Sequence, residues 1–514
     1  MRGVQSGGHV SLRGWVAVLG GVVGCFMAGM NVHVTNASLP DVRGSLGASF
    51  EEGSWITTAY LVAEIIVIPM TGWLVSVFSM RRVLMVGTGG FVVFSILCST
   101  APDITTMIAA RALQGAFGGV LIPLSLQIIV TELPASKHPF GMALFAVSNN
   151  VAQAAGPSLG GWLTQAYSWR WIFYLQVPPG LLLLAAIGWA MPREETRIER
   201  LREGDWAGIA TMALGLSALQ IMLEGGGRKD WFSSSFIVEA GVAAVVSLIA
   251  FVVIELRREK PLINLRLLGQ ANFGLASLMQ FVFGAIVFGV VFLVPNYFAE
   301  TQGYNAQAIG MTMIPYGLIQ FVMSFATPRL MRWTSVRAII IAGFVIMAAG
   351  CLMNIHLDGD AAANVIVPSL VVRGVGQSFI VVALGVMAMQ GMARAETGSA
   401  SGLFSTVRNV GGAIGIALAS QFVVEREKLH AARIGEAVTP FSQALRNRME
   451  AAASVIAGHP VKGHGVESVS RQIFALIDRN LHREALLLAY SDAFLVAGIC
   501  MLLCAGGSML LGRK

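Results

Sequence analysis

Long apolar segments recur along the whole chain and restrict what it can fold into. A helix rises 1.5 Å per residue, so about 20 mostly apolar residues cross the hydrocarbon core of a bilayer. The chain is 55% hydrophobic and 12% charged, about half the charge of a typical soluble protein. These properties predict an all-α polytopic membrane protein. The predicted spans number fourteen: 14–37, 55–78, 83–100, 104–130, 139–164, 171–191, 206–224, 235–256, 272–298, 307–331, 336–356, 363–390, 398–424 and 486–510.

The basic residues of the short loops predict the orientation of the chain. With the N-terminus in the cytoplasm, most Lys and Arg of these loops fall on the cytoplasmic side, as the positive-inside rule requires. They lie at 81–82, 193–202, 257–260, 329–337 and 513–514. We therefore expect both termini in the cytoplasm. The same distribution accounts for the net charge of +7, so we expect no nucleic-acid partner.

Two distant segments share one pattern. RALQGAFGGVLIP from Arg111 and RGVGQSFIVVAL from Arg373 each place an arginine inside a predicted span, before a glycine-rich helix face. A parallel repeat is typical of transporters whose two halves enclose a substrate site near mid-bilayer. We expect a six-helix half at 1–191, a charged linker and two extra spans at 192–260, and a second six-helix half at 261–514. The second half would contain a long outer loop at 425–485, with two helical extensions and a break at 458–465.

Glu64 lies in the middle of the predicted span 55–78, about 14 Å from its first residue. A carboxylate near the membrane midplane costs several kcal/mol unless it is protonated, paired or facing water. A low-dielectric environment favours the protonated form, so the group can bind and release a proton as its exposure alternates. The alternative is a structural carboxylate, although buried ion pairs add little net stability. We therefore expect the proton to be the coupling ion and Glu64 to bind it.

Three arginines lie inside predicted spans. Arg111 needs a partner or a wet cavity, and Gln114 lies one turn away on the same helix. The glycines that follow remove side chains and permit close helix packing. Arg111 is therefore a second candidate for proton coupling, whereas pairing with backbone carbonyls is the alternative. Arg373 and Arg408 are candidates for the substrate cavity or for structural roles.

Polar residues of the predicted fifth span precede a glycine-proline cluster. Gly156, Pro157, Gly160 and Gly161 predict a hinge or a sealing face, because proline removes a helix hydrogen bond and glycine permits bending. The same stretch matches the hydrolase pattern G-x-S-x-G, but no strand precedes it. The polar candidates for the cavity lining on this and the first span are Asn31, His33, Asn149, Asn150 and Gln153. No P-loop or HExxH pattern is present, so neither an ATPase nor a metal-dependent enzyme is indicated, and we expect no cofactor.

Four motifs together resemble the major facilitator superfamily, and within it the fourteen-helix drug:proton antiporters. They are RALQGAFGG at 111–119, AAGPSLGGW at 154–162, WRWIFYLQVPPG at 169–180 and ASGLFSTVRNVGGAIG at 400–415. The pattern is most similar to EmrB-type multidrug efflux permeases of the Gram-negative inner membrane. The resemblance implies that the arginine of the first motif takes part in proton transfer. It also implies a periplasmic membrane-fusion adaptor and an outer-membrane channel as partners.

The chain departs from this family pattern at two positions. Asn31 stands where the first span usually has an acid, and Ser76 stands where the loop after the second span usually has an aspartate. The role of the first-span acid cannot be carried over, and Glu64 is expected to replace it. The loss of this acid also favours neutral or acidic substrates over cationic ones.

The function predicted from the sequence is proton-coupled efflux of hydrophobic or amphipathic toxic compounds by a secondary active transporter. One alternative is a dedicated exporter of a metabolite or siderophore; the motif at 154–162 argues against import but not against this export. Another alternative is a non-transporting membrane sensor, in which Glu64 would have no purpose. Docking of the adaptor on the outer loop competes with a purely solvated helical cap.

Overall fold

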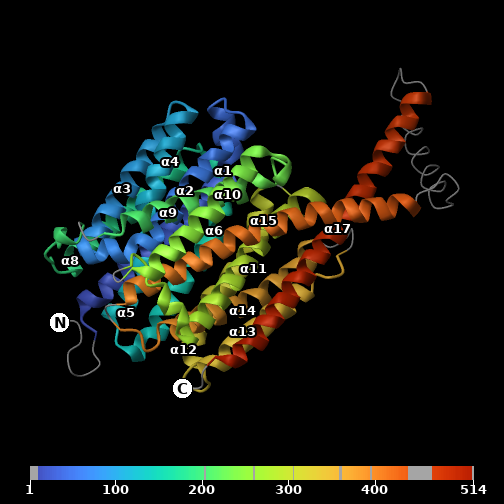
Figure 1. The fold of residues 1–514 in the computed structure, drawn as a ribbon. Helices are drawn as coiled ribbons and strands as arrows, with labels where there is room; N and C mark the ends of the chain where they lie inside the picture. The colour runs from blue at the N-terminus through green and yellow to red at the C-terminus, as the bar shows by residue number, and fades with distance from the viewer. Residues whose placement is uncertain are drawn as a thin grey trace.

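The structure is a computed structural model that describes residues 10–201, 204–258, 261–304, 306–357, 362–393, 396–437 and 466–511. The elements in these residues are helices and short 3-10 turns. Figure 1 shows them as one elongated helical assembly, from which two helices project at one end. The predicted break at 458–465 and the predicted basic residues 202, 260, 513 and 514 lie outside the described residues.

The helices before residue 191 pack together, and we call them the N-terminal bundle. One hydrophobic core joins α1, α2, α3, α5, α6 and α8 and continues into the helices after residue 270. The elements are α1 (Leu12–Ser45), α2 (Phe50–Phe78), α3 (Met80–Thr100), α4 (Ile104–Gly118), α5 (Leu121–Glu132), the turn η1 (Ala135–Lys137), α6 (His138–Ala166), α7 (Trp171–Tyr174) and α8 (Val177–Ala190).

The helices after residue 270 form a second group, which we call the C-terminal bundle. In it α11 packs along α15, and α13 packs along α14 and α17. The elements are α11 (Ala271–Gln302), α12 (Ala306–Leu330), α13 (Val336–Leu352), α14 (Ala363–Met389), α15 (Thr397–Ala437), α17 (Val466–Gly507) and the turn η5 (Ser508–Leu510).

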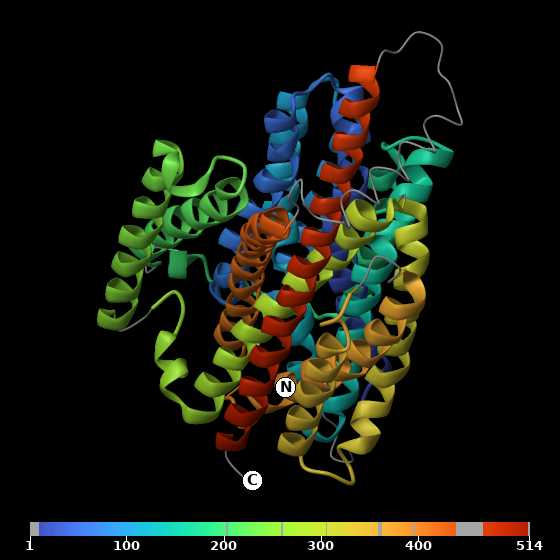
Figure 2. The ribbon, with the colours of Figure 1, turned by 90° about the vertical axis from the view of Figure 1, so that its right-hand side faces the viewer.

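Two helices that lie between the two bundles in the sequence form a separate hairpin, which Figure 2 shows in green at the side of the assembly. They are α9 (Trp206–Gly226) and α10 (Ser235–Arg257), with the turns η2 (Ile198–Leu201), η3 (Trp231–Ser233) and η4 (Leu265–Gly269). The helix α9 packs against α2 of one bundle and also touches α15 of the other. The side chain of Trp73 on α2 meets Trp206 edge to face, with ring centroids 5.9 Å apart. We call this pair the extra hairpin.

Of the fourteen predicted spans, twelve correspond to segments that are long and apolar enough to cross a membrane. The other two correspond to α13, an apolar helix of 17 residues, and to α6. In the described residues α6 does not reach the same apolarity, because it contains Ser148, Asn149, Asn150 and Gln153. These polar side chains are buried against neighbouring helices and not exposed to lipid. The structure therefore shows a multi-pass membrane protein with about twelve clear spans.

Helix boundaries differ from the sequence-based prediction at four places. The predicted span 104–130 consists of α4 and α5, which are separated by a turn at Gly119 and Val120, and 171–191 consists of α7 and α8. The predicted spans 398–424 and 486–510 belong to longer helices, since α15 runs on to Ala437 and α17 already begins at Val466. These extensions form the projecting arm in Figures 1 and 2. The Asp492 carboxylate joins them at their base through Arg426 (2.5 Å) and His430 (2.7 Å).

The two bundles meet along two seams. On one seam α2 faces α15, and a Cβ added to Gly72 would lie 2.9 Å from the Gly398 carbonyl carbon. On the other seam α6 faces α12, where Ser158 occupies the space that a side chain at Gly310 would need. Close backbone contact at these points holds the bundles together at both ends of the interface, because the Gly72 contact lies near the end of α2 and the Gly310 contact near the start of α12.

Candidate functional site

Arg111 is buried in the N-terminal bundle and binds groups from three helices. Its Nε donates to the Ile56 carbonyl oxygen (3.1 Å), and its Nη1 donates to Asn31 Oδ1 and to Gln114 Oε1 (2.6 Å each). The guanidinium stacks on the Tyr60 ring at 4.2 Å. Its Nη2 has no hydrogen-bond partner among the described residues. The structure thus brings together three of the predicted residues, Asn31, Arg111 and Gln114.

Every acceptor of Arg111 in this network is neutral. Gln114 is oriented by its own amide, whose Nε2 donates to Ser95 Oγ at 2.6 Å. Asn31 presents an amide oxygen where the family pattern has an acid, so the buried cation is solvated by dipoles and not neutralised by a carboxylate. A buried charge without a counter-charge is energetically costly. A neighbouring carboxylate would supply that counter-charge whenever it is deprotonated.

The carboxylate that can supply it is Glu64, on the neighbouring helix α2. Its side chain is 7% exposed, and the described residues show no hydrogen bond or ion pair on it. Glu64 lies one turn beyond Tyr60, the residue on which Arg111 stacks. The structure therefore places an unpaired acid and an unneutralised base on two adjacent helices.

Glycines on α4 make this proximity possible. A Cβ at Gly119 would lie 2.9 Å from the Glu64 carbonyl oxygen, and one at Gly115 would overlap the Tyr60 carbonyl oxygen. The two helices are thus in backbone contact along the turn that carries Tyr60 and Glu64. This confirms the inference from the sequence that the glycines after Arg111 permit close helix packing.

The glycine-proline cluster of α6 packs onto α1. Gly160 leaves its carbonyl oxygen open to Ser38 Oγ at 3.2 Å, and a Cβ added there would lie 2.7 Å from the Val34 carbonyl oxygen. Gly156 faces His33 so closely that a side chain at 156 would overlap the His33 Cβ. Pro157 lies inside the helix, and Gly161 is buried. His33 thus lies at a helix contact and not on an open cavity wall.

Polar side chains of α6 face the C-terminal bundle. Gln377 Nε2 on α14 donates to Asn150 Oδ1 at 3.0 Å, and Gln377 Oε1 in turn accepts a hydrogen bond from the Tyr316 hydroxyl. Polar atoms of Asn149, Asn150 and Gln153 are buried with no partner among the described residues. Such atoms would be hydrated if the bundles separated, as expected for the lining of an alternating cavity.

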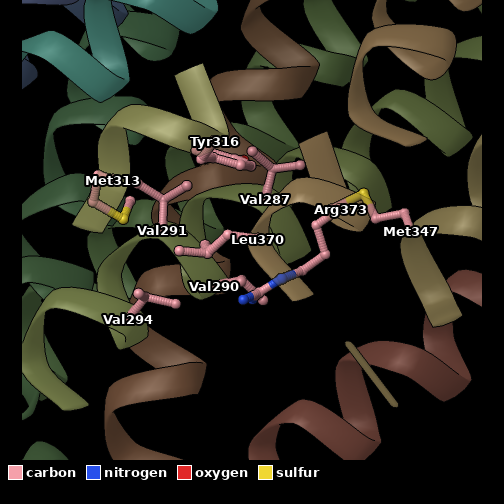
Figure 3. A pocket seen from close by; sticks show the side chains of 9 residues that line it. All are labelled: Val287, Val290, Val291, Val294, Met313, Tyr316, Met347, Leu370 and Arg373. Carbon is pink, nitrogen blue, oxygen red and sulfur yellow. The ribbon is translucent and has the colours of Figure 1, made fainter. Parts of the chain in front are cut away.

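Arg373 lies in the C-terminal bundle, apart from Arg111. Its Nε donates to the Ser369 carbonyl oxygen (3.3 Å) and its Nη2 to Ser369 Oγ (3.0 Å), one turn away on the same helix. The Phe494 ring lies 5.1 Å from its guanidinium carbon. Figure 3 shows Arg373 beside a cavity of about 10 Å³ whose other lining residues are apolar or aromatic. That volume is less than one water molecule needs in practice.

Arg408 of α15 lines a cavity of about 20 Å³ between the bundles. The wall combines α5, α6, α11, α14 and α15, and it includes Gln280, Ser405 and Asn409. These three polar residues were missed in the sequence analysis, although each interrupts an apolar stretch as Glu64 does. The cavity has room for about one water molecule, so the interface between the bundles is closed in this structure.

The predicted site residues therefore fall into three places. Asn31, Arg111 and Gln114 form one hydrogen-bonded network, with Glu64 on the adjacent helix. Asn150 and Arg408 face the interface between the bundles, and Asn149 and Gln153 are buried on the same helix as Asn150. His33 and Arg373 are packed away from that interface. Among the described residues no three His, Cys, Asp or Glu side chains converge on a metal-binding position.

Solved structures of transporters share this fold. The human organic anion transporter MFSD10 matches with a TM-score of 0.59 at 13% identity, over 95% of this chain and 99% of that chain. The proton:xylose symporter XylE matches with a TM-score of 0.56 at 14% identity, over 95% and 94%. At these identities the likeness concerns the fold alone.

Sequence relatives cover almost the whole chain. The colistin resistance protein EmrB of Acinetobacter baumannii is 26% identical over 96% of this chain and 95% of its own length. The fatty acid resistance protein FarB of Neisseria gonorrhoeae is 29% identical over 94% and 93%. The multidrug export protein EmrB of Haemophilus influenzae is 31% identical over 81% and 82%. The family model of the Major Facilitator Superfamily matches residues 21–416. The chain is therefore a secondary transporter, not an enzyme, and it belongs to the Major Facilitator Superfamily, among relatives of the EmrB and FarB exporters.

Proposed function

We propose that the protein exports hydrophobic or amphipathic toxic compounds in exchange for protons. The observation that supports this proposal most directly is Glu64, a buried carboxylate with no hydrogen bond or ion pair in the described residues, next to a buried arginine with only neutral acceptors. A structural carboxylate would be expected to have partners, because an unsatisfied buried charge is strongly destabilising. An unpaired one is suited to change its protonation state during a transport cycle.

In this mechanism Glu64 binds the proton and Arg111 modulates the binding. When Glu64 loses its proton, the carboxylate needs a counter-charge, and Arg111 is the cation on the adjacent helix. When Glu64 is protonated, Arg111 remains held by Asn31, Gln114 and the Ile56 carbonyl. One charge moved through about 100 mV supplies about 2.3 kcal/mol, or roughly a fiftyfold substrate gradient per proton. A single titrating carboxylate is therefore sufficient for useful efflux.

The two bundles are proposed to rock against each other around the closed interface. The units would be 1–191 and 261–514, with the linker and the extra hairpin at 192–260, giving fourteen transmembrane helices if α6 and α13 both cross. The unpartnered polar atoms of Asn149, Asn150 and Gln153 would line the cavity when it opens, together with Arg408. The packed glycines Gly156 and Gly160 would seal the outer side.

The substrates are proposed to be neutral or acidic rather than cationic. Asn31 replaces the acid of the family pattern, and the central cavity contains the cation of Arg408 with amide and hydroxyl groups around it. The relatives are named for resistance to colistin and to fatty acids and for multidrug export, so they leave the substrate open. Strong export of quaternary ammonium dyes and of nothing else would contradict this preference.

We also propose a bacterial inner-membrane location with cytoplasmic termini, and a role as the permease of a tripartite pump with a periplasmic adaptor and an outer-membrane channel. The support is the arm formed by α15 and α17, which extends beyond the bundles (Figure 1). Deleting the outer loop 425–483 should abolish co-purification of the adaptor but leave proton-coupled transport by the permease alone intact. Unchanged co-purification would overturn docking on this loop. The alternative, in which the loop is only a solvated helical cap, would then remain.

The decisive experiment measures compound-dependent loss of a pH gradient in inverted membrane vesicles. The native protein should release the gradient when a transported compound is added, and Glu64→Gln should reduce the rate at least tenfold. The matched control is Glu239→Gln, because Glu239 is exposed on α10; this variant should behave as the native protein does.

The outcomes separate the competing functions. Equal responses of native protein and Glu64→Gln would show that Glu64 is structural and that the proton binds elsewhere. A response to none of a broad set of toxic compounds, at matched expression, would instead favour a dedicated metabolite or siderophore exporter. If neither toxic compounds nor metabolites released the pH gradient, the sensor hypothesis would remain.

A further inference from the structure

A cavity of about 640 Å³ lies at the inner end of the α2–α15 seam, the end at which α2 stops and α15 begins. We call it the vestibule. Trp73 and Ser76 of α2, Gln127 of α5, Asn264 and Arg266 of the segment after the extra hairpin, and Glu396 next to α15 line it. Its volume is within the range of about 300–1,000 Å³ that small-molecule sites occupy. It is far larger than the closed cavity between the bundles.

Specific bonds hold the wall of the vestibule in place. The backbone N–H of Ile263 donates to the buried carboxylate of Glu255 at 3.2 Å, which ties the wall to the extra hairpin. The backbone N–H of Asn264 donates to Ser399 Oγ at 3.0 Å, which ties it to α15. Arg258 pairs with the buried Asp205 at 2.5 Å at the base of the same hairpin. The segment 261–270, which forms one wall of the vestibule, is therefore anchored both to the extra hairpin and to α15.

The lining has a definite chemical preference. Gln127 is 7% exposed. Its Oε1 and the Oδ1 of Asn264 are both buried and have no hydrogen-bond partner among the described residues. Both atoms are acceptors, and the Glu396 carboxylate adds further acceptor capacity. Trp73 contributes an aromatic surface that is fixed by its contact with Trp206. Arg266, the cation of the wall, already donates to the carbonyl oxygens of Leu256 and Arg258. A ligand that matches the remaining groups has a flat apolar body and N–H or O–H donors, and the two amide side chains must turn towards it, because their unpartnered oxygens are buried.

The vestibule also adjoins the contact that closes the seam. Gly72 and Gly398, whose backbones touch, are both part of its wall. Separation of α2 from α15 at this point would join the vestibule to the interface that contains Arg408. A compound held here would be positioned to enter the transport path at the moment of opening.

We propose that the vestibule is a capture site for amphipathic compounds with hydrogen-bond donors, which it binds before they pass between the bundles. This inference rests on the proposed export function and adds a second site to it. The extra hairpin thereby gains a role, because Glu255 of α10 anchors the segment 261–270 that forms one wall of the capture site. The site does not include Glu64, so binding in the vestibule does not require proton transfer.

Cysteine labelling in inverted vesicles tests this proposal. Ser76→Cys places a thiol in the vestibule, whereas Thr334→Cys places one on the exposed loop between α12 and α13. The probes are two cationic dyes of equal charge: rhodamine 6G, which has two N–H donors, and rhodamine 3B, whose nitrogens are fully alkylated. Because the charge is the same, the pair tests the hydrogen-bond donors in the vestibule and not the charge preference of export. Rhodamine 6G should slow maleimide labelling of Ser76→Cys at least fivefold, rhodamine 3B less than twofold, and neither should affect Thr334→Cys. If Ser76→Cys does not fold, Gln270→Cys on the same wall reports instead.

A matched pair of glutamine variants identifies the binding group. Gln127→Leu should raise the rhodamine 6G concentration needed for protection about tenfold, as expected for loss of one buried hydrogen bond. The control is Gln176→Leu, since Gln176 is also buried with unpartnered polar atoms but lies away from the vestibule; it should leave protection unchanged.

Failure of this inference and failure of the export proposal give different results. Protection that persists in Glu64→Gln while proton release is lost would support both. Proton release by the native protein without protection of either cysteine by rhodamine 6G would overturn the vestibule alone. Equal protection by the two rhodamines, or equal effects of Gln127→Leu and Gln176→Leu, would also overturn it.

Discussion

The two arginines of the internal repeat are both buried, but they are held in different ways. Arg111 donates hydrogen bonds to acceptors from α1, α2 and α4, whereas the hydrogen bonds of Arg373 within the described residues go to Ser369 of its own helix. The first therefore depends on the relative positions of three helices, and the second does not. The two arginines of the repeat are thus held differently, one by hydrogen bonds between helices and the other by hydrogen bonds within its own helix.

The glutamines that follow the arginines differ in the complementary way. Gln114 binds Ser95 inside the N-terminal bundle, whereas Gln377 reaches across to Asn150 of the other bundle. The N-terminal repeat unit therefore builds a network within one bundle. The C-terminal unit contributes instead to the interface between bundles.

The largest expected difference comes from replacing each arginine by lysine. A lysine at 111 has one ammonium group and cannot reach the three acceptors that the planar guanidinium binds, so proton-coupled transport should fall at least tenfold. Arg373→Lys can still reach Ser369, so transport should stay within about threefold of native. The measurement is the pH-gradient assay in vesicles at matched expression. Equal losses would show that the two arginines are functionally equivalent and would break the comparison.

Helix contact beside Arg111 should show the next largest effect. Gly115→Ala pushes a methyl group into the Tyr60 carbonyl oxygen and should destabilise the protein by about 1–3 kcal/mol, as overpacking does. The control is Gly89→Ala on α3, because a Cβ there meets nothing within 4 Å. Thermal unfolding in detergent compares the two. A stable Gly115→Ala variant with native transport would contradict the role given to this close contact.

The smallest effects should separate the two glutamines. Gln114→Leu should lower thermal stability by about 0.5–1.5 kcal/mol, the usual value of one hydrogen bond. Gln377→Leu should change stability less, because its bond joins two bundles that separate in the cycle, and should instead favour the open interface. Labelling of Asn149→Cys by a maleimide reports that opening. Faster labelling in Gln114→Leu than in Gln377→Leu would show that Gln114, and not Gln377, holds the interface between the bundles closed.

The membrane fold could be predicted because long apolar segments and loop charges act locally and strongly. The α6 segment shows the limit of this reasoning: its polar residues lower its apolarity, and only packing between two bundles explains why they are tolerated. The turn at Gly119 was missed because a glycine pair reads as a packing face, and here it both packs and ends α4. Sequence periodicity did predict the helical extensions beyond the last two spans.

The candidate site could be predicted only in part. Arg111, Gln114 and Asn31 were singled out as separate polar residues, but their common network depends on how α1, α2 and α4 pack. Gln280 was missed because an isolated polar residue in an apolar helix has no motif. Ser405 and Asn409 lie within the motif at 400–415, but their position at the interface depends on how the helices pack. The vestibule could not be predicted from the sequence, since its wall joins segments as far apart as 72–76, 261–270 and 396–399.

The continuity of α15 has a mechanical consequence. The helix has 41 residues and thus a length of about 60 Å, from the glycine contact beside the vestibule to the arm beyond the bundles. A rod of this length that tilts by about 5° displaces its far tip by about 5 Å. Separation of the helices at Gly398 would therefore displace the tip of the arm. A partner bound to that tip would in turn oppose or delay the separation at Gly398, on the other side of the membrane.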